Sequence, residues 1–192
     1  MIGENLLQRD DEMFWIDRTL YQGKPQDDRL PKEMAVYGLL DSLGIPYLRM
    51  DHDATAHIEG CGEVGEILGV EICKNLFLCN RQKTDFYLLA MPGEKQFHTK
   101  DLSAQIESSR LSFAEAEYME KFLNVTPGSV SVMGLMNDKE NRVKLLLDRD
   151  ILQSEYFGCH PCINTSSLKL KTSDILEKFL PYVGHSPAFV TL

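Results

Sequence analysis

Residues 72–91, ICKNLFLCNRQKTDFYLLAM, contain two apolar runs separated by a short polar segment. Each run is long enough for one strand, and the polar segment RQKT between them is typical of a turn. The pattern predicts a β-hairpin, in which the two strands are antiparallel neighbours. The hairpin decides the fold class, because a doubly wound parallel sheet connects its neighbouring strands through helices.

Helices and further strands are predicted on both sides of the hairpin. Pro31 favours the start of a helix and Gly44 its end. Thr99 is the expected N-cap of a later helix. The segments expected to be helical are 31–43, 62–69, 99–107, 113–124 and a capped helix at 172–183; the expected strands are 45–53, 128–138, 142–150, two strands around a turn within 156–170, and an edge strand at 187–192. This order predicts an α/β (α+β) fold with a mixed, largely antiparallel sheet or partial barrel and packed helices.

Residues 1–30 differ from the rest of the chain because they are rich in charge, and QGKPQDDRLP at 22–31 is typical of a loop. We expect an N-terminal extension over residues 1–30 that packs as a helix on a main domain of residues 31–192. An arm that binds a partner is the alternative interpretation.

Composition limits the classes of protein. The chain has 192 residues, of which 43% are hydrophobic, and a formal net charge of −9. The acidic balance argues against a broad nucleic-acid-coating surface, so no DNA partner is expected, although a local basic patch can grip an RNA end. The N-terminus lacks the pattern of a secretory signal, and the apolar runs are too short to span a bilayer. We therefore expect a cytoplasmic protein, no membrane partner and five reduced cysteines.

Cys159 and Cys162 flank a histidine and a proline in FGCHPCINTSS, residues 157–167. This spacing is found in zinc half-sites and in redox pairs. A zinc site needs two further ligands, and the sequence has no second close cysteine pair. A redox pair is expected at the start of a helix, whereas a strand is predicted after Cys162. We interpret the motif as a tight turn set by Gly158 and Pro161, and expect no metal and no cofactor.

Lys74 lies inside the first apolar run of the hairpin, next to Asn75. A lone lysine on a strand usually faces solvent, but beside a pocket its ammonium group can bind phosphate. The glycines and small hydroxyl residues of segment 128–138 fit either a β-bulge or a strand break whose backbone N–H groups bind an oxyanion. The residues alone thus indicate a mixed α/β domain with a candidate anion pocket.

Three segments in this order, ICKNLFLCNRQKTDFYLL, PGSVSVMGLMND and YFGCHPCINTSSLKL, resemble the blocks of the YbaK/prolyl-tRNA synthetase editing-domain family. The similarity is greatest to its free-standing prolyl-tRNA deacylases of the ProX or PrdX type, and it covers about residues 31–190. It implies the editing-domain fold and hydrolysis of a mischarged aminoacyl ester, with alanyl-tRNA(Pro) expected first and cysteinyl or seryl esters as alternatives. The implied partners are the 3′ aminoacylated end of tRNA(Pro) and prolyl-tRNA synthetase.

The resemblance also implies residue roles. The expected catalytic group consists of Lys74, which holds the 3′-terminal phosphate, and of Gly158 and His160, whose turn holds the aminoacyl group and the attacking water. The expected substrate-binding residues are Asn75, Gly128, Ser129, Ser131, Gly134 and Pro161, with Asn164, Thr165 and Ser166 as weaker candidates for the rim of the pocket. Because an aminoacyl ester is already activated, positioned water and a stabilised oxyanion suffice for hydrolysis. The thiols have no expected role.

Two other functions stay open at this point. One is a non-catalytic module that binds aminoacyl-tRNA or the synthetase, and the other is a zinc or thiol-redox protein built on Cys159 and Cys162. If the protein binds tRNA, as a hydrolase or as a non-catalytic module, the candidate phosphate contacts are Lys74, Arg81, Lys83, Lys169 and Lys171.

Overall fold

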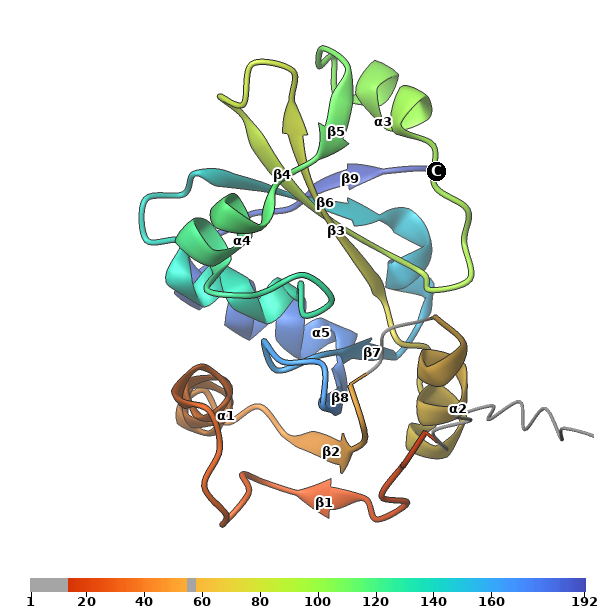
Figure 1. Cartoon of the computed structure of the whole chain (residues 1–192), viewed down its shortest axis with the longest axis vertical. Coiled ribbons are helices and arrows are strands. Elements are labelled where there is room, and N and C mark those ends of the chain that lie inside the picture. Colours follow the sequence, from red (N-terminus) through yellow and green to blue (C-terminus); the bar gives the residue numbers. More distant parts are fainter. Residues whose placement is uncertain (1–13, 55–57) are drawn as a thin grey trace, which may run out of the picture.

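The computed structural model describes residues 14–54 and 58–192, which form two β-sheets with helices between and around them (Figure 1). The strands are β1 (Tyr21–Gln22), β2 (Tyr47–Asp51), β3 (Lys74–Asn80), β4 (Phe86–Met91), β5 (Leu111–Phe113), β6 (Val143–Asp148), β7 (Tyr156–Cys159), β8 (Ser166–Lys171) and β9 (Ala188–Val190). The α-helices are α1 (Pro31–Ser42), α2 (Ile58–Leu68), α3 (Thr99–Gln105), α4 (Ala116–Leu123), α5 (Thr172–Asp174) and α6 (Leu180–Val183). The 3₁₀ helices are η1 (Val132–Asn137) and η2 (Arg149–Gln153), and a π-helical turn, η3 (Ile175–Phe179), joins α5 to α6.

Strands β3 and β4 form the predicted antiparallel hairpin, with Lys74 opposite Met91. The Oδ1 atom of Asn80 accepts hydrogen bonds from the backbone N–H groups of Thr84 at 2.9 Å and Asp85 at 3.2 Å, which stabilises the turn. The hairpin belongs to a five-stranded sheet of order β5-β3-β4-β6-β9. In this sheet β6 is parallel to β4, and β9 is parallel to β6 at the edge, where the sequence predicts an edge strand.

The second sheet has four strands in the order β1-β2-β8-β7, and all its neighbours are antiparallel. The predicted pair of strands around a turn is therefore confirmed as β7 and β8. The prediction of a mixed, largely antiparallel α/β fold is also confirmed, and the strands of the described residues do not close a barrel.

The main core lies between the two sheets, where both contribute buried apolar side chains together with α1, α4, η1 and the C-terminal helices. Phe77 comes from the five-stranded sheet, Leu168 from the four-stranded sheet and Leu40 from α1. A smaller cluster packs α2 on the outer side of the four-stranded sheet through Met50 and Leu68. Figure 1 shows α1 and α2 on either side of this sheet. The two sheets are thus held together by one continuous apolar layer.

The strand predicted over residues 128–138 is wrong, because the structure has the 3₁₀ helix η1 there. The Oγ atom of Ser131 accepts the backbone N–H of Met133 at 3.2 Å and so begins the helix. A Cβ atom at Gly134 would lie 3.0 Å from the Cβ of Leu123, so this glycine lets η1 pack on α4. The alternating serines and valines of the segment imitate a strand, but the tertiary contact with α4 favours the helix.

The N-terminal extension also differs from its expectation over the residues that the structure describes. Residues 14–30 contain β1, which pairs with β2, and an isolated bridge between Ile16 and His52, but no helix. The expected helix over residues 1–13 lies outside the described residues. The extension therefore adds a strand to the four-stranded sheet.

All five predicted segments contain helix, but their bounds differ: α2 begins at Ile58, α4 begins at Ala116 because β5 extends to Phe113, and the segment 172–183 consists of α5, η3 and α6. Pro31 is the first residue of α1, and Gly44 follows the helix with φ of +61°. Thr99 is the first helical residue of α3 rather than its cap, which is His98. Within the described part of the chain, no helix has both the length and the apolar character needed to cross a membrane.

Candidate functional site

Gly158 lies in β7 rather than in the turn that it was expected to set, and it contacts the segment directly before β3. The backbone N–H of Cys73 donates a hydrogen bond to the carbonyl of Gly158 at 2.9 Å, and Ile72 forms a parallel bridge with the same residue. A Cβ atom at Gly158 would lie only 2.5 Å from the backbone oxygen of Glu71, so any side chain here would collide with the backbone. This close approach brings the segment that carries Lys74 beside the turn that carries His160.

His160 is buried, with 8% of its surface exposed. Its Nδ1 atom lies 2.9 Å from the carbonyl oxygen of Ser166, and because a carbonyl only accepts, Nδ1 must carry the proton. Burial lowers the pKa of His160 to about 4, although the hydrogen bond to Ser166 favours the charged form. At neutral pH the imidazole is therefore uncharged, with an unprotonated Nε2 atom that can accept a hydrogen bond.

A second histidine, His52, lies beside His160, and their ring centroids are 6.0 Å apart. The Nδ1 atom of His52 donates to the carbonyl of Asp53 at 2.8 Å, and its Nε2 atom is 2.9 Å from the hydroxyl of Ser167. The same hydroxyl is 3.3 Å from Nδ1 of His160. Sequence reasoning missed His52 and Ser167, because the hydrogen bond between them joins residues that are 115 positions apart in the chain.

Three predicted substrate-binding residues lie around the same turn. The hydroxyl of Ser131 donates to the backbone oxygen of His160 at 2.6 Å. Gly128 has φ of +84°, and a Cβ atom there would lie 3.3 Å from the Nδ2 atom of Asn164. The structure therefore brings η1 and its preceding loop onto the β7–β8 turn.

The other predicted residues are placed less centrally. Ser129 and Pro161 are buried, and the backbone N–H of Ser129 closes a turn with Thr126. Thr165 is exposed, and its carbonyl accepts the backbone N–H of His52 at 3.1 Å. Gly134 packs on α4, so its observed contact is structural.

Lys74 and Asn75 begin β3 and are both partly buried. The ammonium group of Lys74 donates to the carbonyl of Lys95 at 2.8 Å and pairs with no carboxylate in the part of the chain that the structure describes. Asn75 donates from Nδ2 to the carbonyl of Cys73 at 3.0 Å, whereas its Oδ1 atom is buried without a partner among the same residues. Neither side chain is hydrogen-bonded to His160. The pair thus offers a cation and an acceptor for a ligand.

A cluster of charged groups lies behind the turn. Asp51 accepts hydrogen bonds from Arg29 at 2.8 Å and 3.2 Å, from the hydroxyl of Ser166, and from Arg49. Burial alone would raise the pKa of Asp51, but these hydrogen bonds outweigh it and lower the pKa to about 2. The cluster ties the N-terminal extension to Ser166, whose carbonyl binds His160, and no pattern in the sequence pointed to Arg29.

The two thiols of the turn are poorly suited to redox or zinc chemistry. Cys159 and Cys162 are buried and unpaired. Burial raises the pKa of Cys162 to about 12 and that of Cys159 well above its ordinary value. A thiol in such surroundings holds little of the thiolate that acts as nucleophile or metal ligand.

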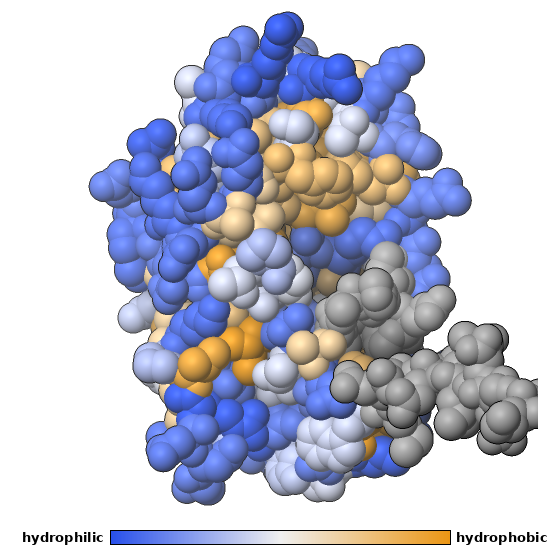
Figure 2. Space-filling model, in the orientation of Figure 1, coloured by the Kyte–Doolittle hydropathy of each residue, from blue (hydrophilic) through white to orange (hydrophobic). Residues whose placement is uncertain are grey.

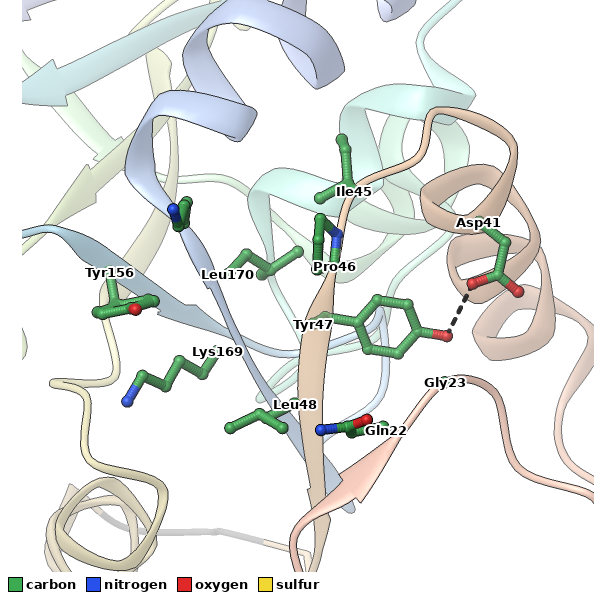
Figure 3. A pocket seen from close by; sticks show the side chains of 11 residues that line it. Gln22, Gly23, Asp41, Ile45, Pro46, Tyr47, Leu48, Tyr156, Lys169 and Leu170 are labelled. Atoms are coloured by element: carbon green, nitrogen blue, oxygen red, sulfur yellow. Dashed lines mark hydrogen bonds between the residues drawn. The ribbon is translucent and has the colours of Figure 1, made fainter.

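A separate pocket of about 460 Å³ lies beside β2 and β8 (Figure 3). The ammonium group of Lys169 lies 4.4 Å from the ring centroid of Tyr156, and Tyr47 donates a long hydrogen bond of 3.4 Å to Asp41. The lining residues are Gln22, Gly23, Asp41, Ile45, Pro46, Tyr47, Leu48, Tyr156, Lys169, Leu170 and Lys171. None of the predicted catalytic residues lines this pocket, which therefore differs from the candidate site.

Comparison with known proteins gives one family match and several relatives. A family model described as "Aminoacyl-tRNA editing domain" matches residues 52–178. The "Prolyl-tRNA editing protein ProX" of Acetoanaerobium sticklandii is 32% identical over 155 residues, which are 80% of this chain and 93% of that protein. The bovine "Prolyl-tRNA synthetase associated domain-containing protein 1" is 31% identical over 59% of this chain and 68% of its own length.

The fold is also found among solved structures. One that is described as a candidate trans-editing enzyme for prolyl tRNA synthetase superposes with a TM-score of 0.64, covering 86% of this chain and 99% of that chain at 16% sequence identity. At this identity the similarity shows a shared fold and no more.

Proposed function

Since this chain belongs to the aminoacyl-tRNA editing domain family, we propose that it is a trans-editing hydrolase that deacylates mischarged tRNA(Pro), above all alanyl-tRNA(Pro). The observation that carries the proposal is the contact at Gly158, which places the start of β3, with Lys74 and Asn75, against the turn of His160. The name of the ProX relative, similar over four fifths of this chain, supports the choice of tRNA(Pro).

The reaction is hydrolysis of an ester. A water oxygen forms a bond to the carbonyl carbon of the amino acid, the bond from that carbon to the ribose oxygen breaks, and the ribose oxygen leaves with a proton. The products are free amino acid and uncharged tRNA. Because the ester is activated already, the site has to orient water and stabilise the developing oxyanion.

Lys74 and Asn75 are the proposed contacts for the 3′ end of the tRNA. The Lys74 ammonium group is partly buried and binds only a neutral carbonyl among the described residues, so its positive charge is available for the terminal phosphate. The unpartnered Oδ1 atom of Asn75 is an acceptor suited to the ammonium group of the aminoacyl moiety. Together they would hold the substrate at both sides of the ester.

His160 is proposed to orient rather than to deprotonate. An imidazole with a pKa of about 4 is a weak base, so at neutral pH it accepts a hydrogen bond at Nε2 without taking a proton from a ribose hydroxyl or a water. The backbone of its turn, fixed by Ser131, is the proposed support for the carbonyl group of the substrate. The ribose 2′-hydroxyl then helps to activate the water.

The remaining assignments are proposals of the same kind. Gly128, Ser129, Pro161, Asn164 and Thr165 would form the rim of the amino-acid pocket, and the contact between Gly128 and Asn164 supports this assignment. Gly134 is a weaker candidate because it packs on α4. We place the protein in the cytoplasm, with prolyl-tRNA synthetase as a partner, residues 1–30 as an extension and residues 31–192 as the editing domain.

Alanine is the proposed amino acid because a synthetase pocket built for proline admits a smaller side chain. Discrimination by one or a few methylenes is worth about 1–3 kcal/mol, so a second hydrolytic step is needed. Cysteinyl and seryl esters have similarly small side chains and are the nearest competing substrates.

The test is a deacylation panel with alanyl, cysteinyl, seryl and prolyl esters on tRNA(Pro). We expect alanyl-tRNA(Pro) to give the highest kcat/KM and prolyl-tRNA(Pro) to be spared. Tight binding of aminoacyl-tRNA without turnover would favour a non-catalytic binding module. An unchanged deacylation rate in a chelator would exclude a metal ion from the reaction. An unchanged rate in a Cys159→Ser/Cys162→Ser variant would exclude the two thiols.

A further inference from the structure

The ammonium group of Lys74 is held by the loop of residues 92–98, between β4 and α3. The Nζ atom donates a hydrogen bond to the backbone carbonyl of Lys95 at 2.8 Å. A lysine side chain has many rotamers, so fixing its end in one place costs conformational entropy. The direction of this ammonium group therefore depends on how firmly the carbonyl of Lys95 is fixed.

Lys95 is fixed through its own side chain. Its Nζ atom lies 2.8 Å and 3.0 Å from the two carboxylate oxygens of Asp148, and 2.7 Å from Asp150. Asp148 is completely buried at the end of β6. Burial opposes the charge of Lys95, but the hydrogen bonds to the two carboxylates outweigh it and raise the pKa of this lysine. The ammonium group of Lys95 is thus held by two carboxylates, while its backbone carbonyl binds Lys74.

The same loop packs tightly on the segment that precedes Lys74. A Cβ atom at Gly93 would lie 2.5 Å from the carbonyl oxygen of Ile72, and the backbone N–H of Glu94 donates to Glu71 at 3.2 Å. On its other side, this segment lies against Gly158 with equally little space. The approach to Lys74 is therefore enclosed between the loop and β7, and a shift of the loop would move the lysine relative to His160.

We propose that Lys95 is a positioning residue for Lys74, and that the Lys95–Asp148 ion pair keeps the Lys74 ammonium group aimed at the anion it binds. The identity of that anion, the 3′-terminal phosphate of tRNA, rests on the proposed function. Lys95 occupies both carboxylates, and Lys74 binds a neutral carbonyl oxygen. A single hydrogen bond to this acceptor leaves two N–H donors of the Lys74 ammonium group for the substrate.

The first test is steady-state deacylation of alanyl-tRNA(Pro) by Lys95→Met, which removes the ammonium group but keeps the stem. We expect KM to rise about 2- to 10-fold, the worth of one hydrogen bond, with a smaller change in kcat. Lys95→Arg should restore KM, because a guanidinium group binds two carboxylates. Lys144→Met is the matched control. Lys144 lies on β6, as Asp148 does, and its ammonium group forms an exposed ion pair of 2.8 Å with Asp85. This variant should keep the KM and kcat of the wild type.

The second test needs no tRNA and therefore separates this proposal from the proposed function. Acetic anhydride labels lysines, and peptide mass spectrometry of the full chain gives the relative rate at Lys74, with Lys178 as internal reference. Lys95→Met should raise the Lys74 rate about 2- to 10-fold, because the ammonium group loses its fixed acceptor. If Lys95→Met fails to fold, Lys95→Met/Asp148→Asn removes both charges and should give the same increase. An unchanged Lys74 rate in a folded variant overturns the proposal, whether or not the wild type hydrolyses the ester.

Discussion

His160 combines three properties at one residue: burial, a fixed tautomer and a depressed pKa. The hydrogen bond from Nδ1 to the carbonyl of Ser166 leaves Nε2 as the acceptor. Burial keeps the ring uncharged throughout the physiological range. These properties suit a group that orients a substrate, and they also make the stability of the fold depend on pH.

The first prediction concerns this pH dependence. The folded-state pKa of His160, about 4, lies below the value of 6.5 expected when unfolded, so at intermediate pH only the unfolded chain binds the proton. The free energy of unfolding should therefore fall by about 2 kcal/mol from His160 alone as the pH decreases from 7 to 5. Urea unfolding of the wild type and of His160→Gln at both pH values measures this difference. An equal loss of unfolding free energy in the wild type and in His160→Gln would contradict a lowered pKa of His160.

The second prediction concerns Gly158, where the nearest obstacles to a Cβ atom are backbone atoms that cannot turn aside. Gly158→Ala should destabilise the fold by about 1–3 kcal/mol and lower deacylation, because β3 must move away from the turn. Gly38→Ala is the control, since nothing lies within 4 Å of a Cβ atom there and the position is inside α1. The free energy of unfolding of Gly38→Ala should rise by about 0.5–1 kcal/mol. Thermal melting measures the stability of both variants, and kcat/KM measures their deacylation. A Gly158→Ala variant with the stability and activity of the wild type would refute the steric argument.

At the scale of elements, η1 connects the main core to the candidate site. Ser131 begins this 3₁₀ helix by accepting the N–H of Met133, and its hydroxyl donates to the carbonyl of His160. The buried apolar side chains of η1 anchor it in the core. A single hydroxyl therefore links a helix start to the turn between β7 and β8.

The third prediction is that Ser131→Ala loses about 1–2 kcal/mol of stability and part of the activity, because both hydrogen bonds disappear and the His160 carbonyl is released. Ser42→Ala, which removes an exposed hydrogen bond to Leu39 at the end of α1, should change stability less and activity not at all. Chemical unfolding and deacylation kinetics provide the comparison. A loss of stability without any loss of activity would limit Ser131 to a structural role.

The elements that follow from local pattern were predictable, and those that depend on tertiary contact were not. The hairpin of β3 and β4 follows from two apolar runs, and α1 follows from Pro31 and Gly44. In contrast, η1 has the alternation of a strand, and the cap at Ser131 together with the packing on α4 through Gly134 favours a helix. Lys74 and His160 were recognisable by resemblance, whereas Arg29, His52 and Lys95 act through partners distant in sequence, which no single sequence reveals.

At the scale of the whole molecule, the protein is acidic while its proposed substrate is a polyanion. Figure 2 shows that most of this face is hydrophilic, with an apolar area over the five-stranded sheet. Lys169 and Lys171 lie on β8 and line the pocket of Figure 3, and the first residue of this strand, Ser166, accepts a hydrogen bond from His160. A local basic area near the site would let tRNA bind in spite of the net charge of −9.

The fourth prediction is that Lys169→Glu/Lys171→Glu weakens tRNA(Pro) binding and reduces the dependence of the affinity on salt, because phosphate contacts are lost. Lys100→Glu/Arg110→Glu makes the same change in net charge in α3 and just before β5, and Figure 1 shows α3 and β5 near the top, away from β8. This control should have a smaller effect. Fluorescence anisotropy over a salt series measures both, and equal effects would mean that only the net charge matters.

The most direct test of the central claim is single-turnover hydrolysis of alanyl-tRNA(Pro) by the wild type and by Lys74→Ala. The account predicts rapid release of alanine by the wild type and a loss of at least about tenfold in the variant, because the substrate loses its main cationic contact. Circular dichroism should show that the variant is folded. A wild type that releases no alanine, or a Lys74→Ala variant as fast as the wild type, would contradict the account.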